Sequence, residues 1–145
     1  MNILVVVDDL SRWLKLAQFL RAANYTPRLA ENSLDAINIF PEADLIMVDA
    51  ELSSGGVELC RELRCRGYSR PLLLMALESL DDVRLSGADD WIEFPFYGPE
   101  IALKVELLLT RYQLWTMGSQ TNPSFYASFC TIDSIAKSGK PIKNC

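Results

Sequence analysis

The sequence of 145 residues contains no histidine. Without histidine, and with four cysteines that include no C-x-x-C pair, the chain has no basis for a zinc site or for a Cys–His or Ser–His nucleophile. Glycine and proline are scarce, at seven residues each, and half of the residues are apolar, which excludes collagen-like and low-complexity chains. The composition fits one compact domain with one buried core.

Positive charge is scarce as well. Lysine and arginine number 14 against 19 acidic residues, so the formal net charge is −5 at pH 7. Binding to a nucleic-acid backbone needs clustered basic residues, and we therefore expect no direct nucleic-acid partner. The longest apolar runs, such as residues 71–77, are too short to cross a bilayer, and the first run carries no basic leader. We expect a cytoplasmic protein without membrane contact.

Short apolar runs alternate with helical patterns along most of the chain. Runs without polar alternation predict strands that are covered on both faces, and they occupy residues 2–7, 44–48, 71–77 and 91–92. Helical patterns begin near Ser11, Asn32 or Ser33, Gly56, Ser79 and Gly98. A β-α alternation repeated five times implies right-handed crossovers and a doubly wound parallel sheet.

The character of the chain changes after about Trp115. Residues 118–123 are turn-forming, and the remainder is rich in Ser, Thr and Lys. We therefore predict one domain over residues 1–117 and a C-terminal extension or linker over residues 118–145. The aromatic residues Phe125 and Tyr126 leave open whether this segment folds back onto the domain.

Acidic residues follow two of the predicted strands. Asp8 and Asp9 come directly after the first strand, and Asp49 ends the strand at residues 44–48. With the strand order 2-1-3-4-5, these two strands are neighbours and the three carboxylates face one pocket at their carboxyl ends. Clustered carboxylates repel one another unless a cation is present, and oxygen ligands of this kind suit magnesium. For any single aspartate, the alternative is a helix N-cap or a solvated loop.

Residues 1–115 resemble the receiver domain of bacterial two-component response regulators. The resemblance lies in an ordered set of motifs: residues 3–9 (ILVVVDD), 44–49 (DLIMVD), 56–64 (GVELCRELR) and 87–92 (GADDWI), ahead of Pro95-Phe96. It implies a flavodoxin-like (βα)5 fold with three α/β/α layers. It also implies that Asp49 is the phosphoacceptor for a histidine kinase, and that Asp8, Asp9, Asp49 and the backbone carbonyl of Glu51 hold magnesium. In this family the signal leaves through the fourth helix, fifth strand and fifth helix.

The sequence departs from this family at the switch positions. Ala76 stands where the family has a Thr or Ser, and Phe94 stands where it has a Lys. Loss of the fixed cation slows phosphoryl transfer, and loss of the hydroxyl removes the contact that reads the modified state. The loop after Asp49 also lacks the usual Pro, and residues 76–87 are about a helical turn short. Trp91 matches the family's switch aromatic, but we favour a packing role in which it fills the space beside Ala76.

The last predicted helix carries extra leucines on its outer face. Leu103, Leu107 and Leu114 lie outside its core stripe, beside Lys104 and Arg111. Leucines on a solvated face favour a homodimer or a contact with another signalling protein. The alternative is that they cover the shortened fourth helix or receive the C-terminal segment.

We therefore predict an atypical receiver that acts mainly through protein–protein contacts and has impaired phosphate switching. The alternative is a conventional receiver that a histidine kinase phosphorylates at Asp49 and that controls a transcriptional output. An enzyme or organic-cofactor binder is disfavoured, because no glycine-rich phosphate loop follows the first strand. The roughly thirty residues after Trp115 are too few for a winged helix, so DNA reading would need sequence beyond Cys145 or a partner.

Overall fold

The computed structural model describes residues 1–75, 80–93 and 97–121. Within them the chain alternates strands and helices, and one short 3-10 helix, η1 (Phe40–Glu42), follows the second helix. The strands are β1 (Asn2–Val6), β2 (Thr26–Ala30), β3 (Leu45–Asp49), β4 (Leu72–Met75) and β5 (Asp90–Ile92). The helices are α1 (Leu10–Ala22), α2 (Ser33–Ile39), α3 (Gly56–Cys65), α4 (Leu80–Ser86) and α5 (Gly98–Thr121).

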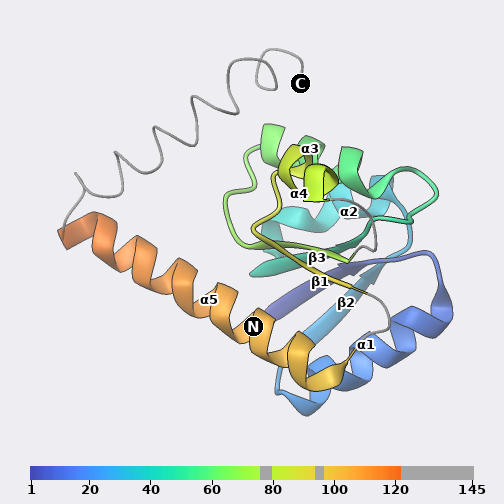
Figure 1. The fold of residues 1–145 in the computed structure, drawn as a ribbon, viewed down its shortest axis with the longest axis horizontal. Coiled ribbons are helices and arrows are strands. Elements are labelled where there is room, and N and C mark those ends of the chain that lie inside the picture. Colours follow the sequence, from blue (N-terminus) through green and yellow to red (C-terminus); the bar gives the residue numbers. More distant parts are fainter. Residues whose placement is uncertain (76–79, 94–96, 122–145) are drawn as a thin grey trace.

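The five strands form one parallel sheet in the order β2-β1-β3-β4-β5. Helices α1 and α5 cover one face of the sheet, and α2, α3 and α4 cover the other (Figure 1). This is the predicted three-layer, flavodoxin-like architecture, which the structure confirms. The strand β2 was not located in the sequence, because Pro27 and the polar residues of this edge strand hide the apolar pattern.

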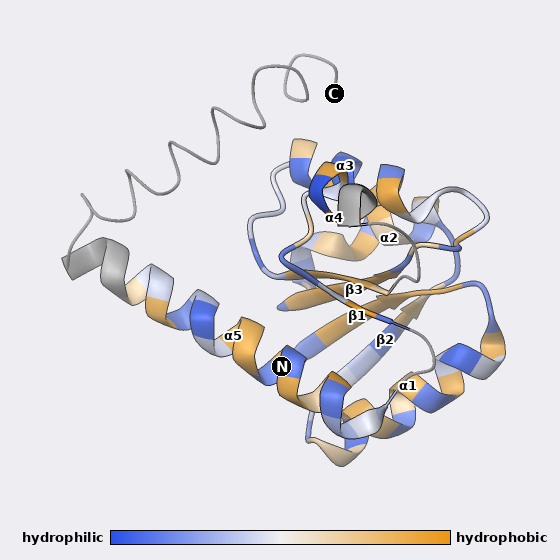
Figure 2. Cartoon of the chain, in the orientation of Figure 1, coloured by the Kyte–Doolittle hydropathy of each residue, from blue (hydrophilic) through white to orange (hydrophobic). Residues whose placement is uncertain are grey.

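Alternate residues of the central strands supply two separate apolar clusters. Leu4, Val6, Ile46 and Val48 pack with α2 and α3, whereas their neighbours in the sequence pack with α1 and α5. Hydrophobic residues accordingly run along β1 and β3 between the two helical layers (Figure 2). Each fully buried leucine or isoleucine contributes about 2 kcal/mol of transfer free energy, so both layers are held to the sheet by burial.

Capping side chains mark the starts of α1 and α2. Asn32, one of the two predicted starts of this helix, caps α2 by accepting a hydrogen bond from the Asp35 N–H at 2.9 Å. Asn24 follows α1 with a positive φ of 68°, a conformation that closes a helix. Ser11, near which this helix was expected to begin, could have served as the cap of α1, but it lies inside the helix. The cap is Asp9, whose carboxylate accepts hydrogen bonds from the first-turn N–H groups of Ser11 and Arg12.

Helix α5 is longer than the sequence pattern predicts. It continues through Gly118 to Thr121, four residues past the predicted domain boundary at residue 117, and its C-terminal half extends beyond the sheet (Figure 1). The remainder of the predicted extension, like Ala76, Ser79 and Phe94, lies outside the described residues. Across the described parts of the chain, no helix combines the length and apolar character needed to cross a membrane.

Candidate functional site

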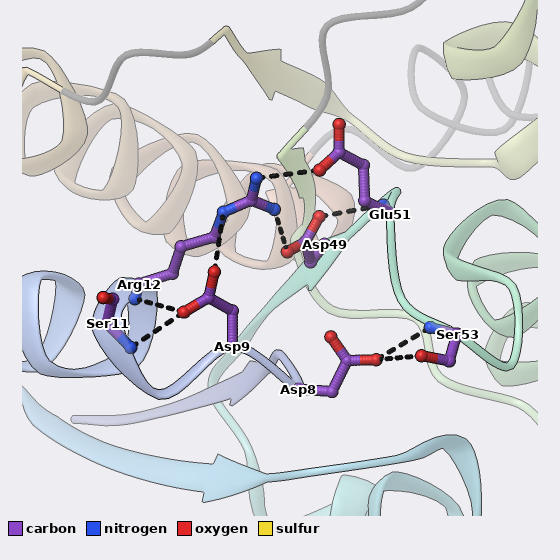
Figure 3. Close-up of polar contacts among 7 residues, drawn as sticks. All are labelled: Asp8, Asp9, Ser11, Arg12, Asp49, Glu51 and Ser53. Carbon is purple, nitrogen blue, oxygen red and sulfur yellow. Dashed lines mark hydrogen bonds and ion pairs between the residues drawn. The ribbon is translucent and has the colours of Figure 1, made fainter.

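The acidic residues singled out in the sequence lie at the carboxyl ends of β1 and β3. The two strands are hydrogen-bonded neighbours, with Val6 opposite Val48. The loop after β1 carries Asp8 and Asp9, and β3 ends at Asp49. Figure 3 shows their carboxylates, and that of Glu51, at one end of the sheet.

Asp49 is almost completely buried, with 1% of its side chain exposed. Its Oδ1 accepts a hydrogen bond from the backbone N–H of Glu51 at 2.8 Å. Its Oδ2 accepts one from Nη1 of Arg12 at 2.6 Å. Both carboxylate oxygens are therefore engaged by donors of the chain itself.

Arg12 is the residue around which this site is organised (Figure 3). Besides its bond to Asp49, its Nη2 donates to Oε2 of Glu51 at 2.7 Å, and its Nε lies 3.8 Å from Oδ2 of Asp9. Its side chain is 25% exposed. The planar, forked guanidinium can contact several carboxylates at once, which the single ammonium of a lysine does less well. One side chain thus neutralises part of the charge of three acids.

Sequence reasoning missed Arg12, although a signal for it exists. Arg12 lies three residues after Asp9, and residues at that spacing share one face of a helix. Because Asp9 caps α1, the first turn of this helix starts at the pocket, and a long basic side chain from that turn reaches across to β3. The spacing predicts that Arg12 lies near Asp9, but it does not predict which other carboxylate the guanidinium binds.

Asp8 binds the loop after β3 through Ser53 (Figure 3). Its Oδ2 accepts hydrogen bonds from the backbone N–H of Ser53 at 2.8 Å and from the Ser53 hydroxyl at 2.6 Å. The hydroxyl bond is the main reason that the pKa of Asp8 is lowered from its ordinary value, followed by the bond from the backbone N–H. Asp8 thereby ties the β3–α3 loop to the end of β1.

Burial and pairing oppose each other at the central ion pair. Burial raises the pKa of Asp49 above its ordinary value, although the Glu51 N–H and the Arg12 guanidinium act in the other direction. Burial also lowers the pKa of Arg12, but its bonds to Glu51 and Asp49 outweigh this and the net shift is upward. Arg12 therefore stays cationic and supplies the charge partner that a buried carboxylate needs.

Gly56 lets the start of α3 approach the end of β3. A Cβ at this position would collide with the backbone carbonyl of Asp49 and with Cα of Ala50. Only glycine fits at this position, because the β3–α3 loop passes so close to the backbone of Asp49. The segment that carries Glu51 and Ser53 is thus held against the pocket.

The arrangement does not fit a magnesium ion. Magnesium requires near-octahedral oxygen ligands at short distances, but Arg12 already occupies Oδ2 of Asp49 and Ser53 occupies Oδ2 of Asp8. In the part of the chain that the structure describes, no three acidic, Cys or His side chains are arranged to hold a metal. The predicted ligands, which are the carboxylates of Asp8, Asp9 and Asp49 and the backbone carbonyl of Glu51, thus come from one end of the sheet, but the three carboxylates are not gathered as a metal-binding group.

Lys104 and Trp91 form a second polar contact, on β5 and α5. The Lys104 ammonium donates to the backbone carbonyl of Trp91 at 2.6 Å and lies 3.3 Å from Oδ1 of Asp90. It also lies 5.2 Å from the centroid of the Trp91 ring, which is partly buried against the core. Lys104 thus contacts β5, whereas the cation that contacts Asp49 is Arg12.

The outer face of α5 is apolar and exposed, as its sequence indicates. Leu103 and Leu107 are each 54% exposed, and Leu114 is 59% exposed. Arg111 is exposed beside them. The described residues therefore leave these leucines uncovered, and what contacts them stays a prediction.

No protein-family model matches the chain. The chain is 34% identical over 116 residues to the transcriptional regulatory protein ResD of Bacillus subtilis (strain 168), an alignment that covers 74% of this chain and 48% of ResD. The chain spans about half the length of the curated relatives it matches.

Solved structures give the same result. A two-component response regulator from Clostridium difficile is 29% identical, with a TM-score of 0.70 over 77% of this chain and 98% of that chain. A CheY-like receiver domain protein from Methanospirillum hungatei JF-1, 20% identical, shares the fold with a TM-score of 0.71 over 77% of this chain and 95% of that chain.

These similarities, together with the sheet order and the acidic pocket, define the class. Over about three quarters of its length the chain is similar to response-regulator receiver domains, the class of protein that its relatives and its fold indicate.

Proposed function

We propose that this chain is an atypical receiver, a signalling domain rather than an enzyme, that acts in the cytoplasm mainly through protein–protein contacts. Phosphorylation at Asp49 is impaired, so phosphate-driven switching plays little part. The observation that carries this proposal is the state of Asp49, which is 1% exposed and paired with Arg12 at 2.6 Å. A phosphodonor must reach a free oxygen of this carboxylate, and both oxygens are already hydrogen-bonded.

The residues at the two altered switch positions support the same conclusion. Phosphoryl transfer depends on cations that stabilise the charge of the transferred group. Phe94 supplies no cation and Ala76 supplies no hydroxyl for the modified state. Arg12 adds a positive charge, but its guanidinium donates hydrogen bonds to Asp49 and Glu51 instead of to an incoming phosphoryl group.

The partner surface of the proposal is formed by α4, β5 and α5. The exposed leucines of α5 fit a homodimer contact or a contact with a histidine kinase or other signalling protein. Since the chain spans about half of its curated relatives, an output activity elsewhere in a longer protein is compatible with this role.

Intact-mass measurement tests the proposal. The protein is incubated with acetyl phosphate and Mg²⁺, beside a conventional receiver as positive control and the Asp49→Asn variant as negative control. We expect the conventional receiver to gain the mass of a phosphoryl group and this protein to stay unmodified. A stable phosphoryl adduct on the wild type that Asp49→Asn removes would instead identify a conventional phosphoacceptor.

A further inference from the structure

We infer that Arg12 is the built-in cation of the acidic pocket, holding Asp49 and Glu51 in the place of a divalent ion and keeping that ion out. The inference deepens the proposed function and rests on it for the role of Asp49. It arises from the mismatch between the acidic residues of the pocket and the ligand geometry that magnesium needs.

The contacts of Arg12 offset part of the negative charge of the pocket. Its Nη1 and Nη2 bridge Asp49 and Glu51 at 2.6 and 2.7 Å, and its Nε faces Asp9 at 3.8 Å. The clustered carboxylates of the sequence predict a cation that contacts several of them at once. In the structure this cation is the side chain of Arg12. Because Arg12 is tethered to α1, its local concentration at the pocket is high and independent of the metal in solution.

Entry of a divalent ion would require several of these contacts to break. Oδ2 of Asp49 would have to release Arg12, and Asp8 would have to release both the N–H and the hydroxyl of Ser53. The bound dication would then lie close to the displaced guanidinium of Arg12, and Asp49 would still be buried. Such repulsion and the lost hydrogen bonds both act against metal binding.

The chain offers a matched control for the charge of Arg12. Arg28 also pairs with a carboxylate, that of Glu42 at 2.9 Å, but both side chains are mostly exposed, at 57% and 71%. Arg28→Gln therefore changes the net charge as Arg12→Gln does, without touching the pocket. Any effect of Arg12→Gln that Arg28→Gln does not share belongs to the site.

Mn²⁺ is the probe, because electron paramagnetic resonance counts the free ion directly. We expect the wild type and Arg28→Gln to show no saturable binding, and Arg12→Gln to bind Mn²⁺ at least about tenfold more tightly than the weakest binding that the titration can detect. Adding Asp49→Asn to Arg12→Gln should abolish the gain. Saturable Mn²⁺ binding by the wild type as tight as that of Arg12→Gln overturns the inference, and so does a folded Arg12→Gln that gains no affinity.

A second measurement needs no variant. A ligand that binds only the folded state raises its melting temperature, so added Mg²⁺ should leave the melting temperature of the wild type unchanged. A concentration-dependent rise overturns the inference even where Arg12→Gln fails to fold. This result is independent of the mass test above, because a protein that binds Mg²⁺ yet gains no phosphoryl group contradicts only the inference about Arg12.

Discussion

Asp49 is a buried carboxylate whose charge depends on one neighbour. Its side chain is 1% exposed, while that of Arg12 is 25% exposed. Breaking a buried pair by removing one partner leaves an uncompensated charge, which is far more destabilising than breaking an exposed pair. The Arg12–Asp49 pair therefore differs in kind from the surface pairs of this chain.

Replacing Arg12 with Ala should lower the free energy of unfolding by about 2–3 kcal/mol at pH 7, less than for a fully buried pair because Arg12 is partly exposed. Arg28→Ala should change it by less than about 0.5 kcal/mol. Urea denaturation measures both. An Arg12→Ala protein as stable as Arg28→Ala would contradict the importance of the pair.

The penalty of Arg12→Ala should also depend on pH. Burial raises the pKa of Asp49 in the folded state, and without Arg12 no cationic side chain of the described residues is known to oppose that effect. Protonation on lowering the pH removes the unpaired charge, so the variant should recover stability relative to the wild type as the pH falls through the raised pKa. Urea midpoints measured from pH 7 downward test this, and a penalty that grows in acid contradicts it.

Asp8 should respond in the opposite direction. Its pKa is lowered mainly by the hydroxyl of Ser53, so this interaction stabilises the fold above the ordinary pKa of an aspartate and is lost as the pH falls through the lowered pKa. Ser53→Ala should raise the pKa of Asp8 and reduce stability at neutral pH only. Carboxyl ¹³C chemical shifts followed against pH measure the change, and an unmoved titration of Asp8 refutes it.

At the scale of elements, the approach of α3 to β3 shapes the pocket. Gly56 has no room for a Cβ because the backbone of Asp49 lies there, whereas Gly67 faces open space and needs only its positive φ of 99°. The two glycines therefore serve different ends. Gly56 sets a distance between elements, and Gly67 allows the chain to turn after α3.

Alanine at the two glycines should separate these roles. Gly56→Ala should destabilise the protein by about 2–3 kcal/mol, because backbone must move to accept the methyl group. Gly67→Ala should cost about 1 kcal/mol of conformational strain. Thermal unfolding by circular dichroism compares them, and equal losses for both variants would argue against a close contact at Gly56.

The elements that the sequence predicts are those with a strong local signal. Continuous apolar runs located β1, β3 and β4, and Asn32 marked the start of α2. The edge strand β2 and the C-terminal turns of α5 were missed, because an edge strand is half polar and a helix can run through Gly118. The acids at the ends of β1 and β3 followed from the sheet order, but the choice of Asp49 by Arg12 is a tertiary contact that no local pattern encodes.

At the scale of the whole molecule, the pocket and the partner surface lie on different elements. Arg12 joins α1 to β3, whereas the exposed leucines lie on α5. In the proposed function, the contact surface acts without a phosphate-dependent change at the pocket. The contact surface can therefore be tested separately from Asp49.

Leu107→Glu should weaken self-association if α5 forms the proposed homodimer contact, because a charge in an apolar interface loses its hydration. Sedimentation velocity over a range of concentrations measures this. Leu34→Glu is the matched control, because Leu34 is 67% exposed on α2, on the opposite face of the sheet. A wild type that stays monomeric throughout rules out the homodimer and leaves a different partner protein.

We propose that Arg12 closes the Asp49 carboxylate to modification. A titration with beryllofluoride and Mg²⁺, a stable mimic of the phosphoryl group on a carboxylate, tests this when it is followed by ¹H–¹⁵N NMR of the wild type. We expect the amide signals of Asp9, Asp49 and Glu51 to stay unshifted. Saturable shifts at these residues that Asp49→Asn abolishes would contradict it.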